Sequence, residues 1–295
     1  MSSRRRHRKA LPAEPVELEI ESLNHEGRGV TRIEGKVGFV DGALTGEKVS
    51  AKYVRKRSSF DEFTTLEVIE PSTSRVAPGC EYFGICGGCS LRHLHSDDQV
   101  NLKESVLLDQ LQHATGLDTE KFELLPQLRG DTDHYRKKAR LAIRVVMKKG
   151  GVLVGFREKY SSFITDMKNC QILDASVAGL IPKMREFIMS LDGAMEIPQI
   201  EVAVGEDSDT DVATAEASAT TADVRPVALI FRHLKPLSES DLAALTDFAR
   251  QESFQLYLQP AGPDSVHKVW PEGEERLRYY LPEFGLQLAF HPQDF

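Results

Sequence analysis

The chain of 295 residues has four cysteines, one tryptophan and no long apolar run. Four cysteines are too few for a scaffold stapled by disulfides. No run approaches the roughly 18 apolar residues of a membrane span. The basic start Arg4–Lys9 leads into prolines rather than an apolar segment, which excludes a secretory signal peptide. The length predicts about two globular domains, and we expect a monomeric, cytoplasmic protein that does not engage a membrane.

The sequence also lacks the short motifs that mark common catalytic sites. It has no G-x-S-x-G, no H-E-x-x-H, no Walker A loop and no G-x-G-x-x-G. Neither a nucleophile motif nor a nucleotide-type glycine-rich loop is therefore evident.

The chain has no overall excess of basic residues either, because it contains 37 Lys and Arg but 45 Asp and Glu. Taken alone, the net charge of -8 disfavours a nucleic-acid partner. Divided along the chain, however, residues 1–60 carry +5 and residues 131–168 carry +6. Acidic regions mask these two basic blocks. We interpret residues 205–224, which are acidic and contain no Lys or Arg, as a disordered insertion, and residues 1–14 as a basic disordered tail.

Residues 15–73 predict a small all-β barrel. Val16, Leu18 and Ile20 alternate with glutamates, which is the pattern of a strand with one wet face. Further short apolar runs follow, separated by glycine turns. Five short strands in about 55 residues favour a barrel, because closure removes exposed strand edges.

Residues 74–285 predict an α+β domain. Its first helix, expected over residues 98–116, is apolar on two opposite sides. Such a helix needs two partners. From residue 135 onward, strand and helix patterns alternate.

The cysteines form a pattern that favours a metal centre. Cys80, Cys86 and Cys89 make a C-x5-C-x2-C motif among glycines, and Cys170 is the fourth cysteine. Four thiolates satisfy either tetrahedral zinc or an iron–sulfur cluster. Zinc ribbons usually contain two C-x2-C pairs and this chain has one, so the spacing favours iron–sulfur. Zinc and four unrelated buried thiols remain the alternatives.

Both basic blocks contain aromatic residues among their cations. Such side chains neutralise phosphates and stack on exposed bases of looped or single-stranded RNA, although a solvated strand face has the same pattern. The candidate RNA contacts are Lys52, Arg55, Lys56, Arg57, Arg136, Lys138, Arg140, Arg157 and Lys159.

Five segments, in this order, resemble the 23S rRNA (uracil-C5) methyltransferases. Residues 16–70 resemble a TRAM domain, an OB-like RNA-binding barrel. The C-x5-C-x2-C motif, H-Y-R-K-K-A-R from His134, G-F-R-E-K from Gly155 and K-x-C ending at Cys170 follow. The resemblance implies a [4Fe-4S] cluster on the four cysteines, S-adenosylmethionine as methyl donor and 23S rRNA as partner. In that family a cysteine thiolate adds to C6 of a flipped-out uracil before C5 takes the methyl group.

The resemblance also implies a departure from the family. Residues 286–295 match the segment that leads into the family's catalytic domain, which predicts that the S-adenosylmethionine-binding α/β domain is absent. The chain would then be an N-terminal, RNA-recognising and cluster-bearing portion that binds RNA without catalysis, and no catalytic residue is assigned. The resemblance also implies that the helix over residues 98–116 docks on the missing catalytic domain, so we expect the side with Leu102 or Val106 to stay exposed in this chain. The alternatives are a free-standing iron–sulfur or zinc RNA-binding module, and a zinc-stapled assembly protein.

Overall fold

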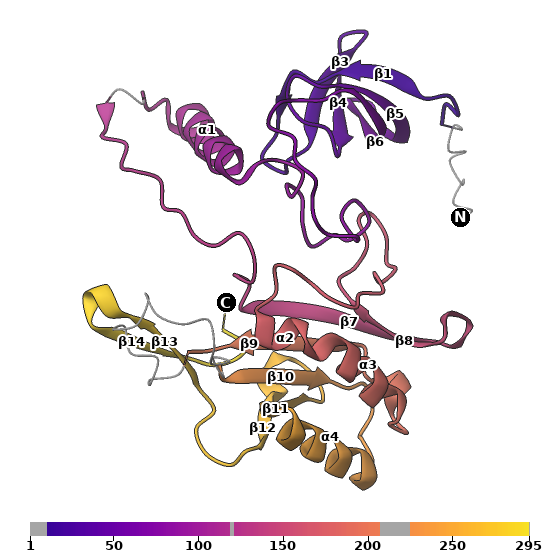
Figure 1. Ribbon diagram of the computed structural model, residues 1–295, viewed down its shortest axis with the longest axis vertical. Coiled ribbons are helices and arrows are strands. Elements are labelled where there is room, and N and C mark those ends of the chain that lie inside the picture. Colours follow the sequence, from indigo (N-terminus) through magenta and orange to yellow (C-terminus); the bar gives the residue numbers. More distant parts are fainter. Residues whose placement is uncertain (1–10, 119–120, 207–224, 295) are drawn as a thin grey trace, which may run out of the picture. The chain divides into compact units, whose positions relative to one another are not determined.

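The computed structural model describes residues 11–118, 121–206 and 225–294, which form two compact units (Figure 1). Unit 1 comprises the described residues up to Gly84 together with Cys89–Arg129, and unit 2 comprises Ile85–Gly88 and the described residues from Gly130 onward. Most of the predicted tail and acidic insertion lies outside the described residues. The chain is thus not divided at the predicted boundary near residue 74, since the first long helix belongs with the barrel.

Unit 1 contains a six-stranded sheet in the order β1-β5-β6-β4-β3-β2. The strands are β1 (Val16–Glu19), β2 (Ser22–Leu23), β3 (Gly29–Ile33), β4 (Lys36–Asp41), β5 (Lys48–Lys56) and β6 (Phe60–Glu70). Two residues separate β1 from β2, yet β1 pairs with β5 and β2 pairs with β3 at the other end of the sheet. This bent first strand closes the sheet into a barrel. The short strands expected over this region are therefore present.

Apolar residues of alternating strand positions fill the barrel. Leu18, Val40, Val49 and Phe63 are among the buried residues that form its core. Each comes from a strand in which neighbouring residues point outward, as the period of two requires. The hydrophobic pattern of the sequence therefore decides which face of each strand is inside.

A buried ion pair joins the barrel to the segment that leaves it. Glu47 is 1% exposed. It accepts a bond of 2.7 Å from Nη2 of Arg75 and bonds from the backbone N–H groups of Leu44 and Ser72 at 2.8 and 3.1 Å. Burial opposes ionisation of Glu47, but these donors outweigh it and lower its pKa. Nη2 of Arg75 also donates to the carbonyl of Gly42 at 2.7 Å, so the pair fixes both ends of a turn.

Helix α1 (Ser96–Thr115) follows in unit 1. It ends as the sequence predicts, because Gly116 is left-handed with φ 67° and its N–H caps a carbonyl of the last turn. No residue of α1 is buried. Leu102 and Val106 are half-buried, whereas Leu107 is 55% exposed. The side expected to stay exposed is thus better covered than the side with Leu107.

Unit 2 contains a second six-stranded sheet in the order β12-β11-β10-β9-β7-β8. Its strands are β7 (Lys138–Val146), β8 (Gly151–Gly155), β9 (Gln199–Val204), β10 (Val227–Arg232), β11 (Phe254–Gln259) and β12 (His267–Trp270). Among these pairings β10–β11 is parallel and the others are antiparallel. The alternation of strands and helices expected after residue 135 is present.

Helices cover one face of this sheet (Figure 1). They are α2 (Ala175–Ala178), α3 (Leu180–Met189) and α4 (Glu239–Gln251). Of the 3-10 helices, η3 (Ala194–Glu196) lies between α3 and β9, and each of the other three lies between two strands: η2 (Met147–Lys149), η5 (Pro263–Ser265) and η6 (Pro282–Phe284). Helix α3 packs on β8, and α4 packs on β11 and β12. Phe187 of α3 stacks on Phe248 of α4 with ring centres 4.1 Å apart, so both helices lie on the same face.

The opposite face is partly covered by a hairpin of β13 (Leu277–Leu281) and β14 (Leu286–Phe290). Leu277 and Phe290 pack against Ile230 and Tyr257 of the sheet. Nζ of Lys138 donates to the carbonyl oxygens of Pro292 and Asp294 and so holds the following residues to β7. The segment predicted to open a new domain at residue 286 is, in its described residues, part of unit 2.

None of the helices in the described ranges is long and apolar enough to cross a membrane.

Candidate nucleic-acid interface

The four cysteines are free thiols, and each of the two units contains two of them. Cys86 and Cys170 are buried in unit 2, and Cys80 and Cys89 are half-buried in unit 1. Within the described residues, no three His, Cys, Asp or Glu side chains form a group that could hold a metal ion. The structure therefore does not show the predicted central domain built around a [4Fe-4S] cluster. The middle residues of the C-x5-C-x2-C segment, Ile85–Gly88, pair with Arg157–Lys159 and belong to unit 2, whereas Cys80 and Cys89 belong to unit 1.

That pairing holds Cys86 beside a basic segment. The N–H of Gly87 donates to the carbonyl of Arg157 at 2.9 Å, and the N–H of Lys159 donates to the carbonyl of Ile85 at 2.8 Å. A Cβ on Gly87 would lie 2.9 Å from that same Arg157 oxygen, so glycine is required for the close approach. The sulfur of Cys86 accepts the N–H of Gly88 at 3.4 Å.

The barrel cations lie at the exposed end of β5 and just after it. Lys52 and Arg57 are exposed. Arg55 pairs with Glu62 at 3.3 Å, and Glu62 also pairs with Arg28 at 3.1 Å. Lys56 lies 4.5 Å from the ring centre of Tyr53, which leaves an aromatic and cationic surface on this strand. All four barrel cations predicted from the sequence are therefore exposed, and Arg55 has a carboxylate partner.

The cations of unit 2 are in more varied environments. Arg136 lies 5.8 Å from the ring of Phe156. Arg140 is held by Glu201, with its Nε 3.0 Å from the carboxylate. Burial lowers the pKa of Lys138, and its bonds to backbone carbonyls engage it within the fold. Lys159 is half-buried and Arg157 is exposed.

Two further arginines belong to this surface. Arg140 pairs in register with Glu201, and Glu201 pairs with Ile230, which faces the hairpin rather than the helices. Side chains alternate between the faces of a strand. Arg144 of β7 and Arg232 of β10 therefore share the face of Arg140, and both are exposed. We name this side, away from the helices, the open face.

Sequence reasoning omitted both residues from the candidate contacts. Arg144 could have been found by continuing the alternation from Arg140. Arg232 could not, because it ends an apolar run in a distant part of the sequence and joins the group only through the strand order.

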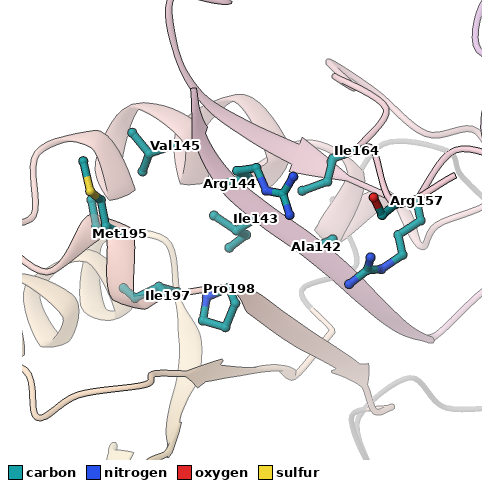
Figure 2. Close-up of a pocket in the computed structure, with 11 residues that line it drawn as sticks. Ala142, Ile143, Arg144, Val145, Arg157, Ile164, Met195, Ile197 and Pro198 are labelled. Atoms are coloured by element: carbon teal, nitrogen blue, oxygen red, sulfur yellow. The ribbon is translucent and has the colours of Figure 1, made fainter. Parts of the chain in front are cut away.

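A pocket of about 330 Å³ crosses β7 where its pairing with β9 ends. Residues 142–145 form its floor. Figure 2 shows Arg157 and Ile164 on one side of the strand and Met195, Ile197 and Pro198 on the other. Arg144 and Arg157 extend toward each other over the floor (Figure 2). None of the described residues that line the pocket is acidic, so this is a concave, positively charged site.

Comparison with known proteins gives strong matches along nearly the whole chain. It is 47% identical over 291 residues to the 23S rRNA (uracil(1939)-C(5))-methyltransferase RlmD of Hahella chejuensis, covering 98% of this chain and 61% of that protein. The corresponding enzyme of Alcanivorax borkumensis is 44% identical with the same coverage. The chain thus spans about three-fifths of the length of these relatives. No family model matches it.

A solved structure shares the fold. The Pyrococcus abyssi tRNA (uracil-54, C5)-methyltransferase, determined with S-adenosyl-L-homocysteine, aligns with a TM-score of 0.59 over 95% of this chain and 60% of that one, at 20% identity. At this identity the match concerns the fold alone.

These matches correct the prediction of an N-terminal portion that lacks the S-adenosylmethionine-binding domain and cannot catalyse. Methyltransferases align along 98% of the chain. The prediction depended on where the sequence ends, and a terminal residue does not show what a protein lacks. We therefore withdraw both the missing domain and the inactivity.

Proposed function

We propose that this chain acts in the S-adenosylmethionine-dependent methylation of uracil C5 in 23S rRNA. The observation that carries the proposal is the 47% identity to the Hahella chejuensis enzyme along 98% of the chain. S-adenosylmethionine would supply the methyl group. The reaction also needs the target base out of its stack, because C5 is inaccessible within a helix.

In this proposal the chain's cations hold the RNA. The barrel acts as a TRAM domain, with Lys52, Lys56 and Arg57 toward the phosphates. In unit 2, Arg136, Arg157 and Lys159 contribute, whereas Lys138 and Arg140 serve the fold through their internal partners. Cations and exposed aromatic rings are the means by which proteins bind unpaired RNA.

Deleting the gene for this chain tests the activity in its own cells. We expect one 5-methyluridine to disappear from 23S rRNA, at the position equivalent to uracil 1939, and to return when the gene is restored. Mass spectrometry of nuclease-digested rRNA measures it. The 5-methyluridine of tRNA in the same cells serves as control and should persist. Unchanged 23S rRNA would refute the proposal.

We also propose that Cys80, Cys86, Cys89 and Cys170 bind a [4Fe-4S] cluster. The support is chemical: four free thiols in a chain without disulfides, three of them at C-x5-C-x2-C spacing, and a backbone N–H donated to the sulfur of Cys86. Thiolates are the ligands that such clusters use. Free thiols also fit a cytoplasmic location.

Anaerobic purification tests this ligand set. About four irons and four sulfides per chain are expected, and the Cys86→Ser and Cys170→Ser variants should lose most of them. Ser90→Ala, next to Cys89, is the matched control and should keep the full complement. Stoichiometric zinc in place of iron would show a zinc site instead, and a metal-free wild-type protein would contradict any metal centre.

A further inference from the structure

The pocket on the open face holds two arginines without a counter-charge. Arg144 and Arg157 have no carboxylate partner in the part of the chain that the structure describes. Two acids adjoin lining residues in the sequence: Glu196 is paired with Lys235 at 2.7 Å, and Glu158 accepts a hydrogen bond from the hydroxyl of Ser161 at 3.2 Å. Two like charges facing one cavity repel each other unless an anion or water lies between them.

The neighbouring cations show that the lack of a carboxylate partner is confined to the pocket. Arg140, on the same strand and the same face as Arg144, is neutralised by Glu201 at 2.9 Å. Lys138, which precedes Arg140 by two residues and lies on the same face of the strand, donates to backbone carbonyls. The compensated charges thus lie toward the hairpin, and the uncompensated ones surround the pocket. Guanidinium groups are the side chains best shaped to bind phosphate through paired hydrogen bonds.

The rim of the pocket is apolar. Met195 of η3 lines one wall and is 74% exposed. On the other side Phe163, which stands between the lining residues Ser162 and Ile164, is 63% exposed. Exposed rings and thioethers pack on the planar faces of nucleobases. The volume of about 330 Å³ is at the lower end for ligand pockets, which suits one nucleotide unit.

We propose that this pocket binds one unpaired nucleotide of an RNA strand, with its phosphate between Arg144 and Arg157 and its base against the apolar rim. The inference rests on the proposed function and deepens it, because it assigns a discrete subsite to the open face. A nucleotide within a duplex does not fit this description, since its base is stacked and unavailable to the rim.

Fluorescence anisotropy with a labelled hexameric oligouridylate tests the assignment. Arg144→Gln and Arg157→Gln should each weaken binding about tenfold and lower the slope of log affinity against log salt by about 0.7. Phe163→Ala should weaken binding about fivefold without changing the slope, because it removes stacking rather than charge. The matched control is Arg250→Gln on α4, which removes one charge from the helix-covered face and should stay within twofold.

Competitors identify the source of the nucleotide. Oligouridylate should displace the probe at concentrations at least tenfold below those of uridine monophosphate or of a duplex of equal length. Equal competition by the monophosphate would assign the pocket to a free nucleotide, and stronger competition by a phosphoserine peptide would assign it to protein; either result overturns the inference.

The inference and the proposed function can fail separately. If the wild type binds 23S rRNA but the pocket variants behave like Arg250→Gln, the subsite is wrong and the proposed function stands. If the wild type binds neither the hexamer nor 23S rRNA, both are wrong.

Discussion

Glu47→Gln should lower the free energy of unfolding of unit 1 by about 3 kcal/mol, because removing one partner of a buried ion pair leaves the other charge buried without a counter-charge. The side chain of Glu47 is fully buried, whereas that of Arg75 retains 22% exposure, which places the effect at the lower end of the usual range. The substitution also weakens the acceptor for two backbone N–H groups. Urea unfolding followed by far-UV circular dichroism measures the loss.

The same pair predicts an acid-dependent stability. The pKa of Glu47 is lowered in the folded state from its ordinary value of 4.5. Its ionised form therefore stabilises the fold above pH 4.5, and that contribution is lost as the pH falls through the folded pKa. Glu47→Gln should remove this part of the acid dependence, so the wild-type and variant curves should converge at low pH.

Glu26→Gln is the matched control in the same barrel. Glu26 pairs with Arg28 at 3.2 Å but is half exposed, and surface pairs contribute little. We expect a change of less than about 0.5 kcal/mol. Fluorescence of Trp270, the single tryptophan and a residue of unit 2, should report an unchanged transition in both variants. If Glu47→Gln were no more destabilising than Glu26→Gln, the pair would not support the barrel.

Gly155→Ala should destabilise unit 2 by about 3 kcal/mol, at the upper end for overpacking, because the clash involves backbone. A Cβ at Gly155 would overlap the carbonyl oxygen of Thr165 and lie 3.0 Å from Cγ of Met167. The N–H of Thr165 donates to the carbonyl of Phe156 at 2.9 Å, so the segment cannot move away without losing this bond. Trp270 fluorescence during urea unfolding gives the measurement.

Gly262→Ala provides the comparison within unit 2. Gly262 has φ −72°, which any residue adopts, and apart from its chain neighbours no atom lies within 4 Å of the position that an alanine Cβ would take. We expect a change within about 0.5 kcal/mol. Equal stability of Gly155→Ala and Gly262→Ala would mean that the contact between β8 and the Thr165 segment is loose.

Local patterns of the sequence predicted much of the secondary structure. The alternation of Val16, Leu18 and Ile20 predicted a strand, and Gly116 predicted the end of α1. Both succeed because strand period and left-handed glycine caps depend on neighbours in sequence. The helix side with Leu102 was assigned wrongly, because which side of a helix is covered depends on what packs there.

The cysteines show that spacing in the sequence does not determine where a residue lies in the fold. Cys86 is close in sequence to Cys80 and Cys89, yet it belongs to unit 2 because its segment pairs with Arg157 and Lys159. That pairing joins residues about 70 positions apart in the sequence, and no local pattern predicts it.

By itself, the sequence of this protein determined the strands of the barrel, the two basic blocks and the set of thiols, because these depend on composition and short-range periodicity. Only the tertiary structure decided which basic residues remain uncompensated. Arg140 is neutralised by Glu201 and Arg144 is not, although both are exposed arginines of β7. Pairing between strands that are distant in the sequence places the carboxylate of Glu201 beside Arg140, whereas Arg144 lies at a pocket without such a partner. For this reason Arg140 serves the fold and Arg144 is available to bind a ligand.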